Sequence, residues 1–144
     1  GQPVDLPGSR ASLVFFFPFA FTGVCSGELR TLSDLAGRFE ELGCRVAAVS
    51  CDSMFSQRVF ADSEDFRFML LTDHWPHGAL AERFGVFEKA KGCALRASFL
   101  LSAEGEVLWQ TVQGLGKPRD VRGHLRVAEE LLRGNDRMIG TPLL

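Results

Sequence analysis

An almost entirely apolar run, residues 12–17, is bounded by Gly8 and Pro18 and is soon followed by a segment with helical spacing. Such a run is typical of a strand buried on both faces, because that strand has no polar side. Over residues 25–42 apolar side chains recur at intervals of three and four, and Gly43 ends the pattern. A buried strand leading into an amphipathic helix indicates an α/β fold.

The rest of the sequence alternates the same two kinds of segment. Further strands are predicted over residues 45–50, 68–72, 96–101 and 106–113, and further helices over 53–63, 76–84 and 118–133. This order favours a sheet with helices on both faces, and the closing hairpin and terminal helix are what a thioredoxin-like fold would show. The length of 144 residues, with no linker or repeat, predicts a single domain over residues 1–144.

Charge and hydropathy argue against two classes of partner. The formal net charge is −2, which gives no electrostatic reason to bind nucleic acid or an anionic membrane surface. The densest apolar stretch, residues 13–21, is interrupted by Pro18 and is shorter than the roughly 20 residues that a membrane span needs. Four cysteines without a Cys-x-x-Cys pair favour a reducing, cytoplasmic location over a disulfide framework or a zinc site.

Cys25 lies where the first strand has ended and the helix begins, a position at which active sites of open α/β sheets collect. In the first helical turn its sulfur would face the positive end of the helix dipole and unpaired N–H groups, which favour the nucleophilic thiolate. Thr22 would share that face and hydrogen-bond the thiolate or a substrate, and Pro18 would cover the thiol. The alternatives are that Thr22 only caps the helix and that Cys25 is an inert core residue.

Arg96 begins an otherwise apolar strand, and an arginine there needs either an anionic partner or exposure to solvent. Its guanidinium is suited to hold a thiolate and to stabilise the negative charge that develops on a leaving group. A surface position at the end of the strand is the alternative. Glu28, one turn after Cys25, is a favourable charge near the start of a helix.

The pattern Pro18-x-x-x-Thr22-x-x-Cys25 resembles the active-site motif of peroxiredoxins at all its fixed positions, and Arg96 resembles the distant arginine of that family. Residues 16–29, together with segments 73–79 and 84–87, look like the one-cysteine alkyl hydroperoxide reductase E subgroup. The resemblance runs from about Pro3 to the final helix.

This resemblance implies a thioredoxin-like fold with a central mixed sheet flanked by helices. The N-terminal segment that peroxiredoxins carry before Ser12 would be shortened here. The implied activity is that of an antioxidant oxidoreductase, a thiol-dependent peroxidase that reduces hydrogen peroxide and organic hydroperoxides without a cofactor. The resemblance also implies a homodimer, with Glu28 and Val24 beside the site. His74 and His77 do not predict a metal site, because Pro76 separates them and no third ligand is clustered with them.

Peroxide attack would leave Cys25 as a sulfenic acid, which a second thiol must reduce. A resolving cysteine five residues further along the helix is absent, because Arg30 occupies that position. Cys93, just before Arg96, is the best internal candidate. We favour a one-cysteine mechanism in which an external thiol, either small or glutaredoxin- or thioredoxin-like, regenerates Cys25. Two other functions stay open, a monothiol thioredoxin-type oxidoreductase and a redox sensor or binding module.

Overall fold

The computed structural model describes residues 10–133, so the predicted shortening of the N-terminal segment lies outside the described residues. The strands are β1 (Ala11–Phe16), β2 (Cys44–Ser50), β3 (Met69–Thr72), β4 (Phe87–Glu88), β5 (Cys93–Ala94), β6 (Arg96–Leu101) and β7 (Val107–Gln113). The helices are α1 (Gly23–Glu41), α2 (Met54–Glu64), α3 (Ala79–Arg83) and α4 (Val121–Ala128), which a π-helical turn continues over Glu129–Arg133. The predicted order of the main strands and helices is confirmed.

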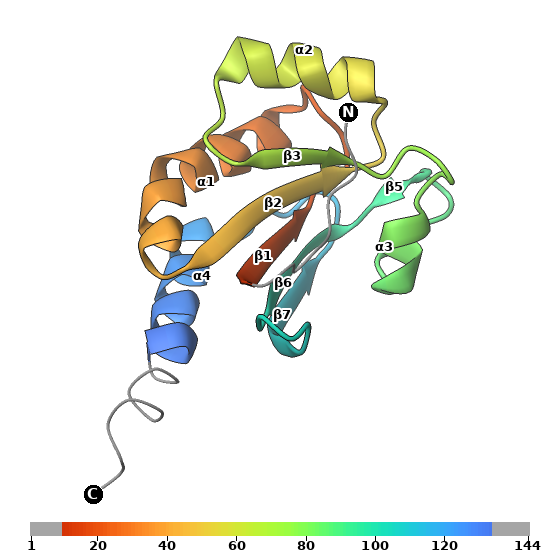
Figure 1. Ribbon diagram of the computed structural model, residues 1–144. Helices are drawn as coiled ribbons and strands as arrows, with labels where there is room; N and C mark the ends of the chain where they lie inside the picture. The colour runs from red at the N-terminus through yellow and green to blue at the C-terminus, as the bar shows by residue number, and fades with distance from the viewer. Residues whose placement is uncertain (1–9, 134–144) are drawn as a thin grey trace, which may run out of the picture.

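Five strands form one mixed sheet in the spatial order β3-β2-β1-β6-β7 (Figure 1). β1 pairs in parallel with β2 and antiparallel with β6, so it lies at the centre of the sheet. Its side chains alternate between the two faces, and residues 12–16 are all buried. The apolar run that predicted a strand covered on both faces is therefore the central strand.

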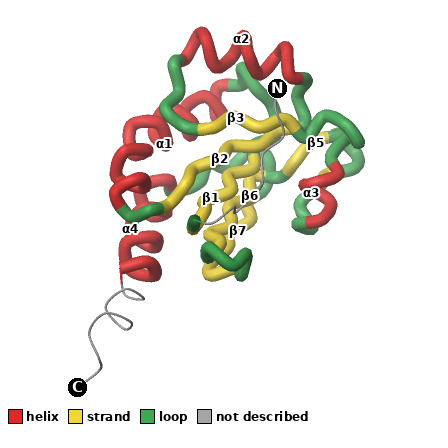
Figure 2. The backbone as a smooth tube through the Cα atoms, viewed as in Figure 1, coloured by secondary structure: helices red, strands yellow, loops and turns green. Residues whose placement is uncertain are grey.

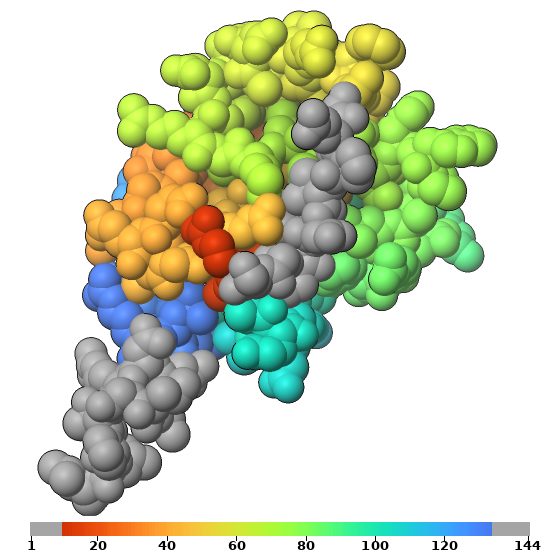
Figure 3. All heavy atoms as spheres, in the orientation of Figure 1, coloured from red at the N-terminus to blue at the C-terminus, as the bar shows by residue number. Residues whose placement is uncertain are grey.

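Helices cover both faces of this sheet (Figures 1 and 2). Leu13 and Phe15 of β1 share one core with the apolar faces of α1 and α4. Val14 and Phe16 share the other core with residues of α3 and of the paired strands β4 and β5. The space-filling view shows α4 lying directly against α1 (Figure 3). This layered mixed sheet is the thioredoxin-like arrangement that the sequence predicted.

Two helices begin later than the sequence predicted. α3 begins at Ala79 rather than at Pro76, because Gly78 adopts a left-handed φ of 73° and the ring of Phe87 fills the space that a Cβ would need. α4 begins at Val121 rather than at Pro118, because the Asp120 side chain caps it by accepting a hydrogen bond from the Gly123 N–H at 3.0 Å. The short strands β4 and β5 were not predicted.

His124 anchors α4 to the sheet. Its Nδ1 lies 2.7 Å from the Asp120 carbonyl oxygen, and its Nε2 lies 2.8 Å from the Ser98 hydroxyl in β6. The ring packs against Phe15 and Trp109. Burial, reinforced by the nearby Arg119 charge and only partly offset by the Asp120 hydrogen bond, lowers the pKa of His124 to about 4.

We expect this histidine to make the fold sensitive to acid. In the unfolded chain His124 titrates near its ordinary pKa of 6.5, so between that value and about 4 only the unfolded state binds the proton. The stabilising effect of the neutral ring is therefore complete above pH 6.5 and falls as the pH drops towards 4. Between pH 7 and pH 4.5 the wild type should lose about 2 kcal/mol more unfolding free energy than His124→Gln, which cannot titrate. Urea unfolding at both pH values measures this difference, and an equal loss in both proteins would contradict it.

Candidate active site

The loop between β1 and α1 is held by contacts from β2 and α2. Asp52, just beyond β2, accepts a hydrogen bond from the Ala20 N–H at 2.8 Å. Phe21 adopts a left-handed φ of 67°, and its ring lies 4.9 Å from the ring of Phe60 in α2. Pro18 is buried where the loop leaves the sheet. These contacts fix the path by which the chain enters α1.

Cys25 lies in the first turn of α1, as predicted, and none of its surface is exposed. Thr22 is the residue at the helix N-cap, but its side chain does not cap the helix. Its hydroxyl instead donates to the Phe19 carbonyl oxygen at 3.1 Å. The predicted hydrogen bond from Thr22 to Cys25 is not among the hydrogen bonds of residues 10–133, whereas the placement of Cys25 at the helix start is as expected.

The structure brings Arg96, Cys25 and Glu28 together. Nη1 of Arg96 lies 3.1 Å from the Cys25 sulfur and 2.7 Å from the Glu28 carboxylate. Its Nε donates to the Leu115 carbonyl oxygen at 2.6 Å, which fixes the plane of the guanidinium. Arg96 is only 4% exposed, so the alternative of a surface arginine at a strand end is wrong.

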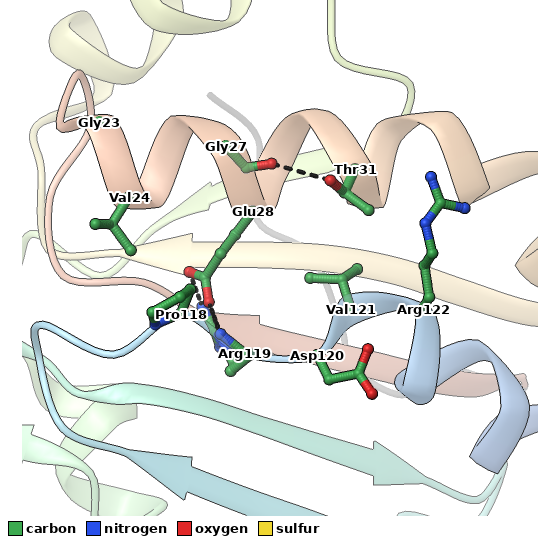
Figure 4. A pocket seen from close by; sticks show the side chains of 10 residues that line it. All are labelled: Gly23, Val24, Gly27, Glu28, Thr31, Pro118, Arg119, Asp120, Val121 and Arg122. Atoms are coloured by element: carbon green, nitrogen blue, oxygen red, sulfur yellow. Dashed lines mark hydrogen bonds and ion pairs between the residues drawn. The ribbon is translucent and has the colours of Figure 1, made fainter.

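Arg119 completes the site, and sequence reasoning missed it. Its Nε and Nη2 donate to the two oxygens of Glu28 at 2.9 and 3.0 Å, and its backbone N–H donates to the same carboxylate at 2.6 Å. The guanidinium lies 3.6 Å from the ring centroid of Phe15. Figure 4 shows the Glu28 side chain reaching from α1 down to Arg119. Recognising Asp120 as the helix cap would have placed Arg119 in the segment before α4, where its N–H and side chain are free to bind Glu28.

These buried charges balance one another. Burial by itself would raise the pKa of the Glu28 carboxyl, but the hydrogen bonds and charge of Arg119, together with the charge of Arg96, lower it below its usual value. Burial lowers the pKa of the Arg119 guanidinium, and Glu28 opposes that shift. Two guanidinium cations and one carboxylate carry a net charge of about +1. The Cys25 sulfur, 3.1 Å from Nη1 of Arg96, therefore lies against a cluster of net positive charge.

A cavity of about 420 Å³ opens beside Glu28, between α1 and the segment that leads into α4 (Figure 4). Val24, predicted to lie beside the site, is on its wall together with Thr31 and Arg122. Cys25 is not among the lining residues, so this cavity reaches the charged cluster at Glu28 and Arg119 rather than at the thiol.

The other three cysteines lie in settings that differ from that of Cys25. Cys44, Cys51 and Cys93 are buried and form no disulfide bonds. Burial raises the pKa of Cys44 to about 12, and burial together with the charge of Asp73 does the same for Cys51. Burial and the charge of Glu88 raise the pKa of Cys93. These thiols stay protonated at neutral pH and are poor nucleophiles.

Within residues 10–133 no three histidine, cysteine, aspartate or glutamate side chains gather in a way that could hold a metal ion. His74 and His77 instead lie near backbone carbonyl oxygens, those of Cys51 at 3.3 Å and Gly92 at 2.7 Å. No helix in the described part of the chain is long and apolar enough to span a membrane.

Comparison with known proteins identifies the family. Residues 2–110 match the AhpC/TSA family. The chain belongs to this peroxiredoxin family. The peroxiredoxin is 37% identical to alkyl hydroperoxide reductase E of Mycobacterium tuberculosis over 124 residues, which cover 84% of this chain and 81% of the relative.

Solved structures agree with this assignment. The crystal structure of Enterococcus faecalis AhpC superimposes on the peroxiredoxin with a TM-score of 0.83 and 30% identity, covering 95% of this chain and 82% of that one. Mycobacterium tuberculosis AhpC gives a TM-score of 0.77 and 28% identity, covering 86% and 70% of the two chains. The family resemblance stated from the sequence is confirmed, and so is the thioredoxin-like fold.

The role of Arg119 can be tested by its removal from the peroxiredoxin. Arg119→Ala would leave the buried Glu28 carboxylate with half its partners, and we expect it to cost about 3–5 kcal/mol of unfolding free energy. Arg122→Ala, three residues away and exposed, is the matched control and should cost less than about 0.5 kcal/mol. Urea unfolding at pH 7 measures both values, and similar losses in the two variants would contradict the assignment.

Proposed function

We propose that this peroxiredoxin reduces hydrogen peroxide and organic hydroperoxides with Cys25 as the attacking nucleophile. The observation that carries the proposal is the 3.1 Å contact between Nη1 of the buried Arg96 and the Cys25 sulfur. A cation at this distance stabilises the thiolate before the reaction and lies where charge develops during it. A binding module or a simple redox sensor would not need a cation placed where charge develops during a reaction, so this contact favours an enzyme.

The chemistry follows from the placement of these groups. The Cys25 thiolate forms a bond to one oxygen of the peroxide, and the electron pair of the O–O bond leaves with the other oxygen. That oxygen takes a proton and departs as water or an alcohol, while Cys25 becomes a sulfenic acid. The guanidinium of Arg96 offsets the negative charge as it moves from sulfur to oxygen, and Glu28 and Arg119 keep that guanidinium in place.

Access to the thiol requires the loop before α1 to move, because Cys25 exposes no surface. Phe19, Phe21 and Val24 are 40%, 56% and 38% exposed in and beside this loop. We infer that a peroxide enters past these side chains. Their apolar surface suits the alkyl portion of an organic hydroperoxide. We expect the buried Pro18 to limit access to the thiol, and the Thr22 hydroxyl, which donates to the Phe19 carbonyl oxygen in this structure, to turn towards an entering peroxide.

Regeneration is assigned to an external thiol, either a small molecule or a glutaredoxin- or thioredoxin-like protein. Support comes from the raised pKa values of the buried Cys51 and Cys93, which keep these thiols protonated and slow to attack a sulfenic acid. Cys93 stays the internal alternative. We further propose that the protein is a homodimer in a reducing, cytoplasmic compartment.

Replacement of two cysteines separates these mechanisms. Cys25→Ser should abolish rapid peroxide consumption, whereas Cys93→Ser, the matched control, should keep the wild-type rate. Mass spectrometry of the peroxide-treated wild type should show one added oxygen at Cys25. Loss of two hydrogens, absent in Cys93→Ser, would instead indicate an internal disulfide. A wild-type rate no higher than that of a free thiol would overturn the peroxidase proposal in favour of a sensor or binding function.

The contribution of Arg96 has its own expected magnitude. Arg96→Ala should slow the oxidation of Cys25 by peroxide about 10²–10³-fold, as expected when one preorganised donor to a developing charge is removed. Arg30→Ala is the control, because it removes an arginine whose ion pair with Glu64 lies at the surface. Stopped-flow oxidation at pH 7 measures both rate constants, and a loss below about threefold in Arg96→Ala would count against the role of Arg96.

A further inference from the structure

Ser98 connects the charged cluster to α4. It lies in β6 two residues after Arg96 and is completely buried. Its hydroxyl oxygen is 2.8 Å from Nε2 of His124 and 3.2 Å from Nη1 of Arg119. This small side chain therefore contacts both His124, which anchors α4 to the sheet, and Arg119 of the candidate active site.

The direction of each hydrogen bond follows from what each group is able to do. The Asp120 carbonyl oxygen only accepts, so Nδ1 of His124 carries the proton in their 2.7 Å contact. Nε2 of the neutral ring then accepts, and the Ser98 hydroxyl must donate to it. The lone pairs left on the Ser98 oxygen accept from Arg119, whose guanidinium can only donate. One arrangement of protons satisfies every group.

We propose that His124 is a positioning residue for the peroxidase reaction. It orients the Ser98 hydroxyl, which in turn holds the guanidinium of Arg119 in place. Arg119 then fixes the Glu28 carboxylate, and Glu28 fixes the guanidinium of Arg96. The proposal rests on the proposed function, because it concerns the same reactive thiol. Each link is an observed contact between side chains that are 6% exposed or less. The series spans α4, β6 and α1 and ends at the Cys25 sulfur.

The histidine matters because a serine hydroxyl is free to rotate. Without an acceptor at the position of Nε2, the Ser98 proton can turn towards the Arg119 guanidinium, where two donors would oppose each other. Arg119 would then lose one of its partners and shift against Glu28. Burial, which lowers the pKa of His124 to about 4, keeps the ring in its accepting, neutral form at physiological pH.

Three variants test this role. His124→Phe keeps a ring of similar size and lacks both nitrogens. His124→Gln can place an amide oxygen near the position of Nε2 and accept from Ser98. His77→Phe is the matched control, since His77 also contacts a carbonyl oxygen, that of Gly92, and none of its contacts within residues 10–133 is with the cluster. For each protein we would measure the rate of Cys25 oxidation by hydrogen peroxide, the rate of Cys25 alkylation by iodoacetamide at pH 9, and the Tm.

We expect His124→Phe to lower the peroxide rate about tenfold, equivalent to about 1.4 kcal/mol. Alkylation should change less than about twofold, because it needs the thiolate but no arginine placed on a leaving oxygen. His124→Gln should recover most of the peroxide rate, and His77→Phe should match the wild type. If His124→Phe lowers only the Tm and leaves the ratio of the two rates unchanged, the histidine is purely structural and the proposal is wrong.

Two further outcomes are decisive. Should His124→Phe fail to fold, Ser98→Ala removes the same link while leaving the ring of His124 in place. Ser98→Ala must then show the same selective loss, and an unchanged ratio of rates would overturn the proposal. Failure of the proposed function would look different, because the wild type itself would then react slowly with peroxide. A wild type and a His124→Phe variant that are equally fast would instead reject only the role of His124.

Discussion

The structure depends on one carboxylate that serves two buried arginines. Glu28 reaches from α1 to Arg96 in β6 and to Arg119 ahead of α4, with side chains at most 4% exposed. Removing such charges from water costs several kcal/mol for each ion, which only close and well-directed contacts offset. The arrangement therefore requires the helix, the strand and the final segment to meet in one geometry. The same requirement fixes a guanidinium against Cys25, so the packing of the fold and the preparation of the thiol have a single physical basis.

Burial alone does not separate Cys25 from the other three cysteines, but the charged groups near each thiol do. All four are buried, yet Cys25 alone has a guanidinium within hydrogen-bonding distance among the contacts of residues 10–133. Cys44, Cys51 and Cys93 have apolar or acidic surroundings that favour the protonated thiol. Of the four cysteines, Cys25 thus has the setting that the proposed reaction needs, and the surroundings of the other three fit the proposal of an external thiol for recycling.

The sequence predicted the fold and named three of the four residues that the structure brings together in the candidate site, Cys25, Glu28 and Arg96. The apolar run of β1 and the periodicity of α1 depend on neighbours in sequence, as does the position of Cys25 at the helix start. Arg96 was found because a charge at the head of an apolar strand demands a partner. Arg119 and its link to Ser98 were missed, because the acceptors lie 91 and 21 residues away and no periodicity connects them. The predicted start positions of α3 and α4 were too early. The left-handed conformation of Gly78 and the cap formed by Asp120 outweighed the helix propensity of the residues before them.

The left-handed backbone of Phe21 has a consequence for the energetics of the loop. A bulky non-glycine residue in this conformation stores about 1–3 kcal/mol, which the contacts of Ala20 with Asp52 and of Phe21 with Phe60 must outweigh. An open loop that returned Phe21 to an extended conformation would recover this energy. Since 1.4 kcal/mol corresponds to a tenfold change in an equilibrium constant, an open form that relieved this strain would be about five- to 150-fold more populated than with a relaxed backbone at Phe21.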